Sequence, residues 1–85
     1  MNDLEIEIGR TLGPSCFFIY QTMKQNSSFT LNEVMIETAM SKNGTENCIK
    51  KLLDTNVLKR DRHSFGSVRQ FVYKVNNEKE TWKFH

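Results

Sequence analysis

The chain has 85 residues, which is enough for one compact domain with a modest core and too few for two. Its 38% hydrophobic and 26% charged residues, with one Pro and four Gly, exclude a disordered or collagen-like chain. The net charge of +2 is divided unevenly, since residues 1–41 carry −3 and residues 42–85 carry +5. A basic half is typical of a phosphate-facing surface, although a solvated basic face would need no ligand. We therefore interpret residues 1–85 as a single domain and expect its binding surface in the second half.

The sequence offers no pattern for a membrane span, a metal site or catalysis. No apolar run approaches the roughly 20 residues that span a bilayer, so we expect a soluble, cytoplasmic protein without a membrane partner. Cys16 and Cys48 lack Cys-x-x-Cys spacing, and His63 and His85 lie in different regions, so neither a metal nor another cofactor is expected. Both thiols are expected to remain reduced and buried. With no Gly-rich phosphate loop, paired carboxylates or Cys beside a His, the chain is not predicted to be an enzyme.

The first part of the chain predicts two helical segments. Leu4, Ile6 and Ile8 alternate as in a strand, but Leu4, Ile8 and Leu12 also fit a helix, which we favour. Pro14 suits the first turn of a helix, where its missing N–H is not needed, and apolar residues then recur at helical spacing. This second helix is expected to end near residue 26.

A capping pattern marks the next helix. Thr30 and Glu33 form the pattern of a capping box, which is a fairly specific start signal and predicts a short helix over about 31–38. Residues 39–41 then supply a tight connection. Ser41 is a good N-cap, so another helix is expected directly after it.

The helix expected over about 42–55 has apolar residues on one face and an entirely polar outer face. It ends at Asn56, a residue that tolerates the left-handed conformation of a helix C-cap. Two β-prone runs follow, 57–62 and 68–75, and residues 63–67 separate them. The predicted fold class is therefore α+β, with a three-helix core followed by a β-hairpin.

Two short helices joined by a tight turn and followed by a basic hairpin resemble the winged helix-turn-helix family. Residues 41–58 carry the local pattern of a Ser cap, a β-branched core residue, a Leu, and a short apolar segment that leads into the wing. The sequence departs from the family pattern at Gly44, where Thr is usual, and at Asn56, where Gly is usual. Gly44 lowers helix stability, so we interpret it as permitting a close backbone approach to DNA. The resemblance covers residues 14–75.

The resemblance implies a sequence-specific double-stranded DNA-binding protein. The helix at about 42–55 would enter the major groove, and the wing at about 57–75 would contact the backbone or the minor groove. Amide, amine and carboxylate side chains can read base edges, and arginines suit a narrow minor groove. The plainer alternative is a solvated helix face and a charged edge strand. The predicted DNA-binding residues are Ser41, Lys42, Asn43, Thr45, Glu46, Asn47, Lys50, Lys51, Arg60, Arg62, His63 and Arg69.

A narrower resemblance is to the TubR-type DNA-binding adaptors of tubulin-like plasmid and phage partition systems. The segment 12–16 that leads into the first family helix, the wing and the overall length look alike. This resemblance implies repeated centromere sites on DNA and a filament-forming tubulin-like GTPase as protein partner. A small transcriptional repressor is the alternative within the family. A winged-helix protein interaction module without DNA contact is a further alternative, which would favour an apolar or acidic face over 42–55.

A surplus of large apolar side chains predicts a homodimer. Residues 17–20 are four consecutive large side chains, more than one helix face can bury, and Trp82 and Phe84 add further surface. A two-fold dimer would place two recognition helices about one helical turn of DNA apart. The alternative is that the N-terminal segment and the tail cover this surface within a monomer.

Overall fold

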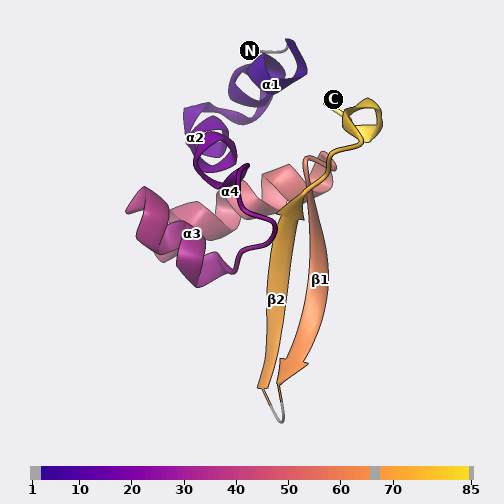
Figure 1. Ribbon diagram of the computed structural model, residues 1–85. Helices are drawn as coiled ribbons and strands as arrows, with labels where there is room; N and C mark the ends of the chain where they lie inside the picture. Colours follow the sequence, from indigo (N-terminus) through magenta and orange to yellow (C-terminus); the bar gives the residue numbers. More distant parts are fainter. Residues whose placement is uncertain (1–2, 66–67, 85) are drawn as a thin grey trace.

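The fold is α+β, and its element order matches a winged helix-turn-helix domain, as predicted. The computed structural model describes residues 3–65 and 68–84, and the side chains of 63–65 and 68–69 lie outside the description. In chain order the elements are α1 (Asp3–Glu7), η1 (Ile8–Leu12), α2 (Pro14–Met23), α3 (Leu31–Thr38), α4 (Lys42–Asp54), β1 (Leu58–Phe65), β2 (Val68–Val75) and η2 (Lys79–Thr81). The hairpin projects from the helices, and α1 and η2 lie at the opposite end of the molecule (Figure 1). None of the described helices combines the length and apolar character needed to cross a membrane.

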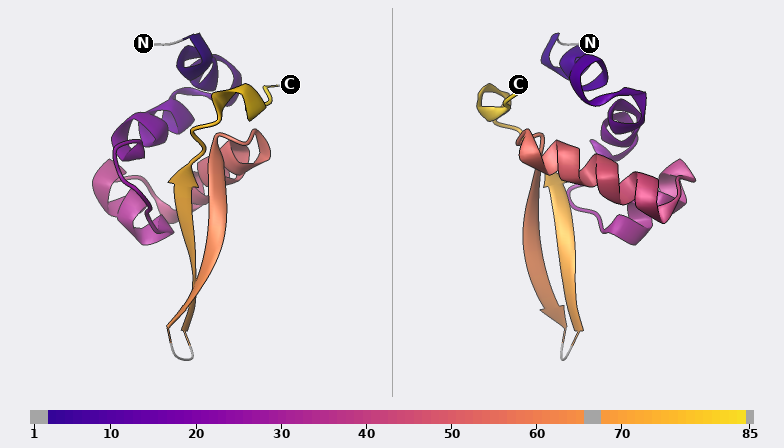
Figure 2. Two further views of the ribbon diagram at one scale, coloured as in Figure 1. Left: turned by 45° about the vertical axis from the view of Figure 1, so that its right-hand side comes forward. Right: turned by 180° about the vertical axis from the view of Figure 1, so that it is seen from behind.

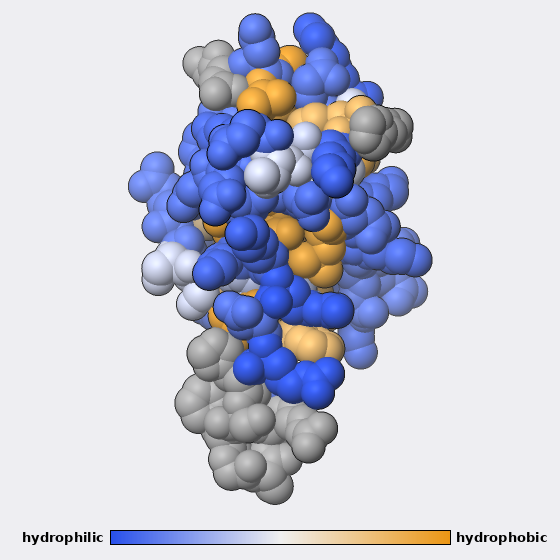
Figure 3. All heavy atoms as spheres, turned by 90° about the vertical axis from the view of Figure 1, so that its right-hand side faces the viewer, coloured by the Kyte–Doolittle hydropathy of each residue, from blue (hydrophilic) through white to orange (hydrophobic). Residues whose placement is uncertain are grey.

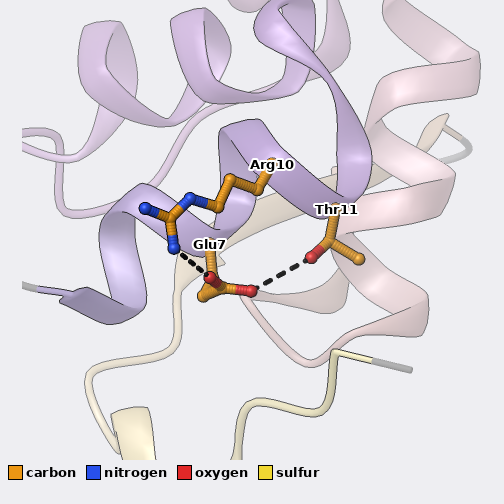
Figure 4. A network of polar contacts seen from close by, with 3 residues as sticks. All are labelled: Glu7, Arg10 and Thr11. Atoms are coloured by element: carbon orange, nitrogen blue, oxygen red, sulfur yellow. Dashed lines mark hydrogen bonds and ion pairs between the residues drawn. The ribbon is translucent and has the colours of Figure 1, made fainter.

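The N-terminal segment is helical, as favoured over the alternative of a strand. α1 leads directly into the π-helical turn η1, and Gly13, with a φ of 106°, separates this turn from α2. Only Gly adopts such a φ without strain. Ile8 is fully buried, while the Glu7 carboxylate accepts hydrogen bonds from Arg10 Nη1 at 3.0 Å and from the Thr11 hydroxyl at 3.3 Å (Figure 4).

The helix-turn-helix consists of α3 and α4, and its caps confirm the predicted ones. Thr30 Oγ1 accepts a hydrogen bond from the Glu33 amide at 3.2 Å, and Glu33 Oε1 accepts one from the Thr30 amide at 3.0 Å. α3 covers the predicted range, and Ala39 then adopts a left-handed φ of 57° that turns the chain towards α4. Ser41 Oγ accepts a hydrogen bond from the Gly44 amide at 3.2 Å.

Two predicted boundaries differ from the structure. α2 ends at Met23, three residues before the expected end, because the chain turns there and the Asn26 amide donates to the Met23 carbonyl at 2.9 Å. The hairpin is longer than predicted, since residues 63–65 belong to β1 in an antiparallel register that starts with Leu58 opposite Val75. Continuous pairing satisfies the backbone groups that a loop would leave to water. The rest of the expected connection, residues 66–67, lies outside the described residues.

The base of the hairpin is joined to the chain that precedes α3. The Phe29 amide donates to the Tyr73 carbonyl at 2.8 Å, and the Tyr73 amide donates back to the Phe29 carbonyl at 2.7 Å. Their rings pack with centroids 6.3 Å apart. β2 is therefore held from two sides near its C-terminal end, by β1 and by Phe29.

The hydrophobic core lies where α2, α3 and α4 meet the base of the hairpin. Ile19, Phe29 and Leu52 are among its fully buried side chains. Cys16 and Cys48 are free thiols and buried, as predicted. The Cys16 thiol donates a weak hydrogen bond to the Cys48 carbonyl at 3.9 Å, so the two cysteines link α2 to α4.

Trp82 in the C-terminal tail is buried, so the expectation that it adds exposed apolar surface is wrong. Trp82 is only 7% exposed, and its ring packs edge-on against Tyr20 of α2, with centroids 5.7 Å apart. Its indole N–H donates to the Asn76 carbonyl at 2.9 Å. Phe84 is partly buried beside Trp82, with ring centroids 6.2 Å apart. The tail therefore completes the core of its own chain, which is the monomer alternative for this segment.

Candidate nucleic-acid interface

The outer face of α4 is polar along its whole length, as predicted. The helix buries Thr45, Cys48, Ile49 and Leu52. Its exposed side chains are Lys42, Asn43, Glu46, Asn47, Lys50, Lys51 and Asp54. At 3.6 residues per turn, Asn43, Asn47, Lys50 and Asp54 lie opposite the buried side chains. Two amides and one amine, with good hydrogen-bonding chemistry for base edges and phosphates, therefore share one outward stripe that ends at a carboxylate.

Glu46 and Lys51 lie on opposite flanks of this stripe. Glu46 lines a groove between α4 and the hairpin together with Arg60. Lys51 lies on the flank towards α2, where its charge acts on Cys16. The pKa of the Cys16 thiol is raised to about 12, mainly by burial and also by the interaction with Cys48, while Lys51 opposes both effects. The sequence prediction grouped Glu46 and Lys51 in one DNA-binding set, whereas in the structure they lie on opposite sides of the stripe.

Hydrogen bonds within the chain fix the start of α4. The Ser41 carbonyl accepts from the Thr45 hydroxyl at 2.7 Å, and Thr45 is fully buried. This member of the predicted DNA-binding set therefore faces the core. A Cβ at position 44 would lie 3.1 Å from Ser41 Oγ and 3.7 Å from Met40 Cε. Gly44 thus makes room for the Ser41 cap, which explains the residue without an approach to DNA.

One face of the hairpin, here called the inner face, carries Arg60, Arg62, Phe71 and Tyr73. Arg60 lies opposite Tyr73 and Arg62 opposite Phe71 in the register, and directly paired residues project to the same side. The Arg60 guanidinium carbon lies 4.5 Å from the centroid of the Phe71 ring, and that of Arg62 lies 5.3 Å from it. Tyr73 is buried, so the inner face is the one that turns towards the helices.

The groove between α4 and the inner face joins the two predicted binding elements. It has a volume of about 590 Å³. Burial raises the pKa of the Tyr73 phenol in this groove, while Arg60 lowers it and Glu46 raises it. Basic and acidic side chains therefore share this groove with the rings of Phe71 and Tyr73. The groove is lined by Leu31, Glu46, Ile49, Lys50, Leu53, Asp54, Arg60, Phe71 and Tyr73.

The opposite side of the hairpin, here called the outer face, carries a second set of charges. Lys59 lies directly opposite Lys74 in the register, and Asp61 lies opposite Val72. The β1 side of the molecule is covered mainly by hydrophilic side chains, with smaller apolar areas between them (Figure 3). The hairpin therefore has basic residues on both faces, and only the inner pair lies beside Phe71.

The side chains of His63 and Arg69, two residues predicted to bind DNA from the wing, lie outside the described part of the structure. His63 pairs with Gln70, and Arg69 pairs with Ser64, in the strand register. Sequence analysis missed Phe71 as part of this surface. The period of two along residues 68–75 was the available signal, since it places Phe71 on the face of a strand that also carries Tyr73.

Comparisons with known proteins bear on the fold. No family model and no curated protein sequence matches this chain. Among solved structures, the chain is similar to Stf76 from the Sulfolobus islandicus plasmid-virus pSSVx, with a TM-score of 0.67 and 17% sequence identity. The match covers 78% of this chain and 86% of that chain. At this identity the similarity bears on the fold alone, and it supports the α+β architecture.

Proposed function

We propose that residues 1–85 form a single winged helix-turn-helix domain that binds double-stranded DNA in a sequence-specific manner. One observation carries the proposal. The outward stripe of α4 and the inner face of the hairpin border the same groove, and Lys50 and Arg60 both line it. A recognition helix in the major groove and a wing on the adjacent backbone or minor groove require the helix and the hairpin to border one surface, and here Lys50 and Arg60 do so beside Glu46 and Asp54.

The exposed residues of α4 divide into two proposed roles. Asn43 and Asn47 are proposed to read base edges, because an amide can bond adenine N6 and N7 together. Lys42 and Glu46 are further candidates for base contact at the start of the helix and on its groove side. Lys50 is proposed to contact phosphates, which fix the register without specifying the sequence. Ser41, the N-cap of α4, and Lys51, on the flank towards α2, are also proposed to contact phosphates.

The basic and amide-rich α4 face favours DNA over the alternative of a protein interaction module, which would use an apolar or acidic face. The resemblance to TubR-type adaptors supports a finer proposal. In that proposal the DNA carries repeated sites, and a filament-forming tubulin-like GTPase is the protein partner. A small transcriptional repressor acting in the cytoplasm on one palindromic site is the competing version.

Binding to random duplexes over a salt series tests the proposal. We expect the affinity to fall steeply with salt, because each neutralised phosphate releases a counterion. Selection of bound sites should enrich a defined sequence, with repeated sites favouring partition and an isolated palindrome favouring repression. Affinity that does not change between about 50 and 200 mM salt would contradict DNA binding.

Matched variants on α4 test the assignment of roles. Asn47→Ala is expected to relax base preference at one position, at a cost of about 1–3 kcal/mol. Lys51→Ala is expected to weaken binding to all sequences alike. If both variants lose affinity uniformly across sequences, α4 does not read bases.

A homodimer remains our proposal for the assembly, on a smaller surface than the sequence indicated. Phe18 is 49% exposed on α2, and a shallow apolar hollow lies nearby in the chain at Ile6, Gly9 and Phe17. Trp82 is buried in its own chain and does not contribute. Two domains would couple two modest sites into one tight site. Sedimentation at micromolar concentration should give a dimer that Phe18→Glu dissociates, and a 10 kDa species for the parent chain would contradict it.

A further inference from the structure

Phe71 is a partly exposed aromatic side chain in a groove lined by both charged and apolar residues. It is 40% exposed, and it lies on the inner face of the hairpin beside α4. The ring is partly open to water and partly covered in the groove beside α4, so burial stabilises it only in part. Its two nearest cationic neighbours offer a reason for its presence.

Arg60 and Arg62 both place their guanidinium groups over this one ring, at 4.5 Å and 5.3 Å from its centroid. Both distances are within the range of a cation–π contact. Neither guanidinium forms an ion pair with a carboxylate among the described side chains. The aromatic ring is therefore the described group that both guanidinium groups share, and neither is held in an ion pair, although Glu46 and Asp54 line the same groove as Arg60.

Both guanidinium groups gather over one ring, so two positive charges lie close together on one face of β1, where they suit a polyanionic strand. Their Cα atoms are two residues apart on that strand, about 6.6 Å. An arginine loses much rotamer freedom when it is fixed by a ligand, and a side chain already fixed in the free protein loses less. Two arginines held in line by a ring would therefore bind two neighbouring phosphates more tightly than two mobile ones.

We propose that Phe71 is a positioning residue, whose ring preorganises Arg60 and Arg62 to hold two successive phosphates of one DNA strand beside α4. This inference rests on the proposed DNA binding for its ligand. It adds a residue that touches no DNA group itself. It also assigns the inner face of the hairpin, and not the outer face with Lys59 and Lys74, to the phosphate strand.

The first test measures the free protein and needs no DNA. The side-chain protons of Arg60 and Arg62 should show upfield ring-current shifts in the NMR spectrum. Phe71→Leu should abolish these shifts, and Phe71→Tyr should keep them. Shifts that stay unchanged in Phe71→Leu would overturn the positioning role, whether or not the protein binds DNA.

The second test is a double-mutant cycle on duplex affinity. Phe71→Leu should weaken binding by about tenfold, because the DNA must then order two mobile arginines, and Phe71→Tyr should keep the parent affinity. In the background of Arg60→Ala with Arg62→Ala, Phe71→Leu should change affinity less than twofold. An equal loss in both backgrounds would mean that the ring acts on its own and would overturn the proposal.

A matched pair of charge-removing variants tests whether the inner face, and not the total charge of the hairpin, contacts the phosphates. Replacing Arg60 and Arg62 with Ala should lower the slope of log affinity against log salt by about 1.8, the value for two phosphates. Replacing Lys59 and Lys74 with Ala removes the same charge from the outer face of the same hairpin and should lower the slope by less. An equal drop would overturn the choice of face. If the parent chain binds no duplex at low salt, the proposed function fails, while the NMR test still decides the role of Phe71.

Discussion

The two ends of the hairpin differ in what holds them. At its base, β1 and β2 are fixed to the helices and to the C-terminal tail by buried side chains and hydrogen bonds. Beyond the pair of Arg62 and Phe71, the described contacts are those of strand pairing, and the outer part of the hairpin stands clear of the helices in both views of Figure 2. The direction in which the hairpin projects is thus set by residues at its base that have no proposed part in binding.

Asn76 is the centre of the fixed base. Its Nδ2 donates to the Asn56 carbonyl at 2.8 Å and to the Thr81 hydroxyl at 2.7 Å, and its Oδ1 accepts from the Glu78 amide at 3.1 Å. Its own carbonyl accepts from the Trp82 indole at 2.9 Å. One buried amide therefore links the end of β2, the end of α4 and the tail.

A second cluster holds the tail to the N-terminal helix. The carboxylate of Glu5 is buried in α1 and forms ion pairs with Lys24 at 3.5 Å and with Lys79 of η2 at 3.7 Å. The Tyr20 ring packs between this cluster and Trp82, and burial with a hydrogen bond to Glu5 raises the pKa of the Tyr20 phenol. The orientation of the hairpin is therefore coupled to segments at both ends of the described chain.

Trp82→Ala should give the largest loss, because it removes a buried indole from the base. We expect the free energy of unfolding to fall by about 3–5 kcal/mol, the usual cost of truncating a large buried aromatic side chain. Urea denaturation followed by circular dichroism measures this. Phe84→Ala is the matched control, since Phe84 is only partly buried, and it should cost less. A loss below about 1 kcal/mol for Trp82→Ala would mean that the tail does not complete the core.

Asn76→Ala should give the next largest loss, because it leaves the Asn56 carbonyl and the Thr81 hydroxyl without their donor. We expect about 1–3 kcal/mol of destabilisation from the broken hydrogen bonds. Asn77→Ala is the control, as Asn77 is exposed, and it should stay within about 0.5 kcal/mol. If the two variants lower the free energy of unfolding equally, the hydrogen bonds of Asn76 do not stabilise the base of the hairpin.

The same comparison explains what the sequence could predict. The capping box at Thr30, the cap at Ser41 and the left-handed Asn56, with a φ of 64°, were predicted correctly, because each depends on hydrogen bonds or backbone preferences within a few residues. The burial of Trp82 was predicted wrongly, because its partners Tyr20 and Asn76 are supplied by the fold and not by neighbouring sequence.

The candidate site follows the same rule. The polar face of α4 was visible in the helical period, since exposure repeats every 3.6 residues. The pairing of Arg60 and Arg62 with Phe71 depends on the strand register, and the extension of β1 through residue 65 was not predicted. Register is set by the whole hairpin and its packing, so a single strand does not reveal it.

The fixed base should also show in the response to alkaline pH. The pKa of the Cys16 thiol is raised to about 12 by burial, against about 8.5 in an unfolded chain. A raised pKa stabilises the folded state fully below about pH 8.5, and this stabilisation is lost as the pH rises towards 12. We expect the free energy of unfolding to fall by about 1 kcal/mol from pH 7.5 to 9.5. Cys16→Ser, which does not titrate there, should show a smaller fall, and equal falls would place the titrating group elsewhere.

Arg62→Ala should have the smallest effect on stability, because it alters the part of the hairpin that the base does not hold. Arg62 is exposed, and its described contact is with the Phe71 ring alone. Such substitutions change stability by no more than about 0.5 kcal/mol. Duplex affinity should nevertheless fall, and the slope of log affinity against log salt should drop by about 0.9 if one phosphate contact is lost.

Arg62→Lys keeps the charge and loses the planar group that stacks on Phe71, so it should retain most of the slope and lose part of the affinity. A loss of stability above 1 kcal/mol would make Arg62 part of the scaffold. Unchanged affinity and slope would remove the outer part of the hairpin from the DNA interface and leave α4 as the binding element.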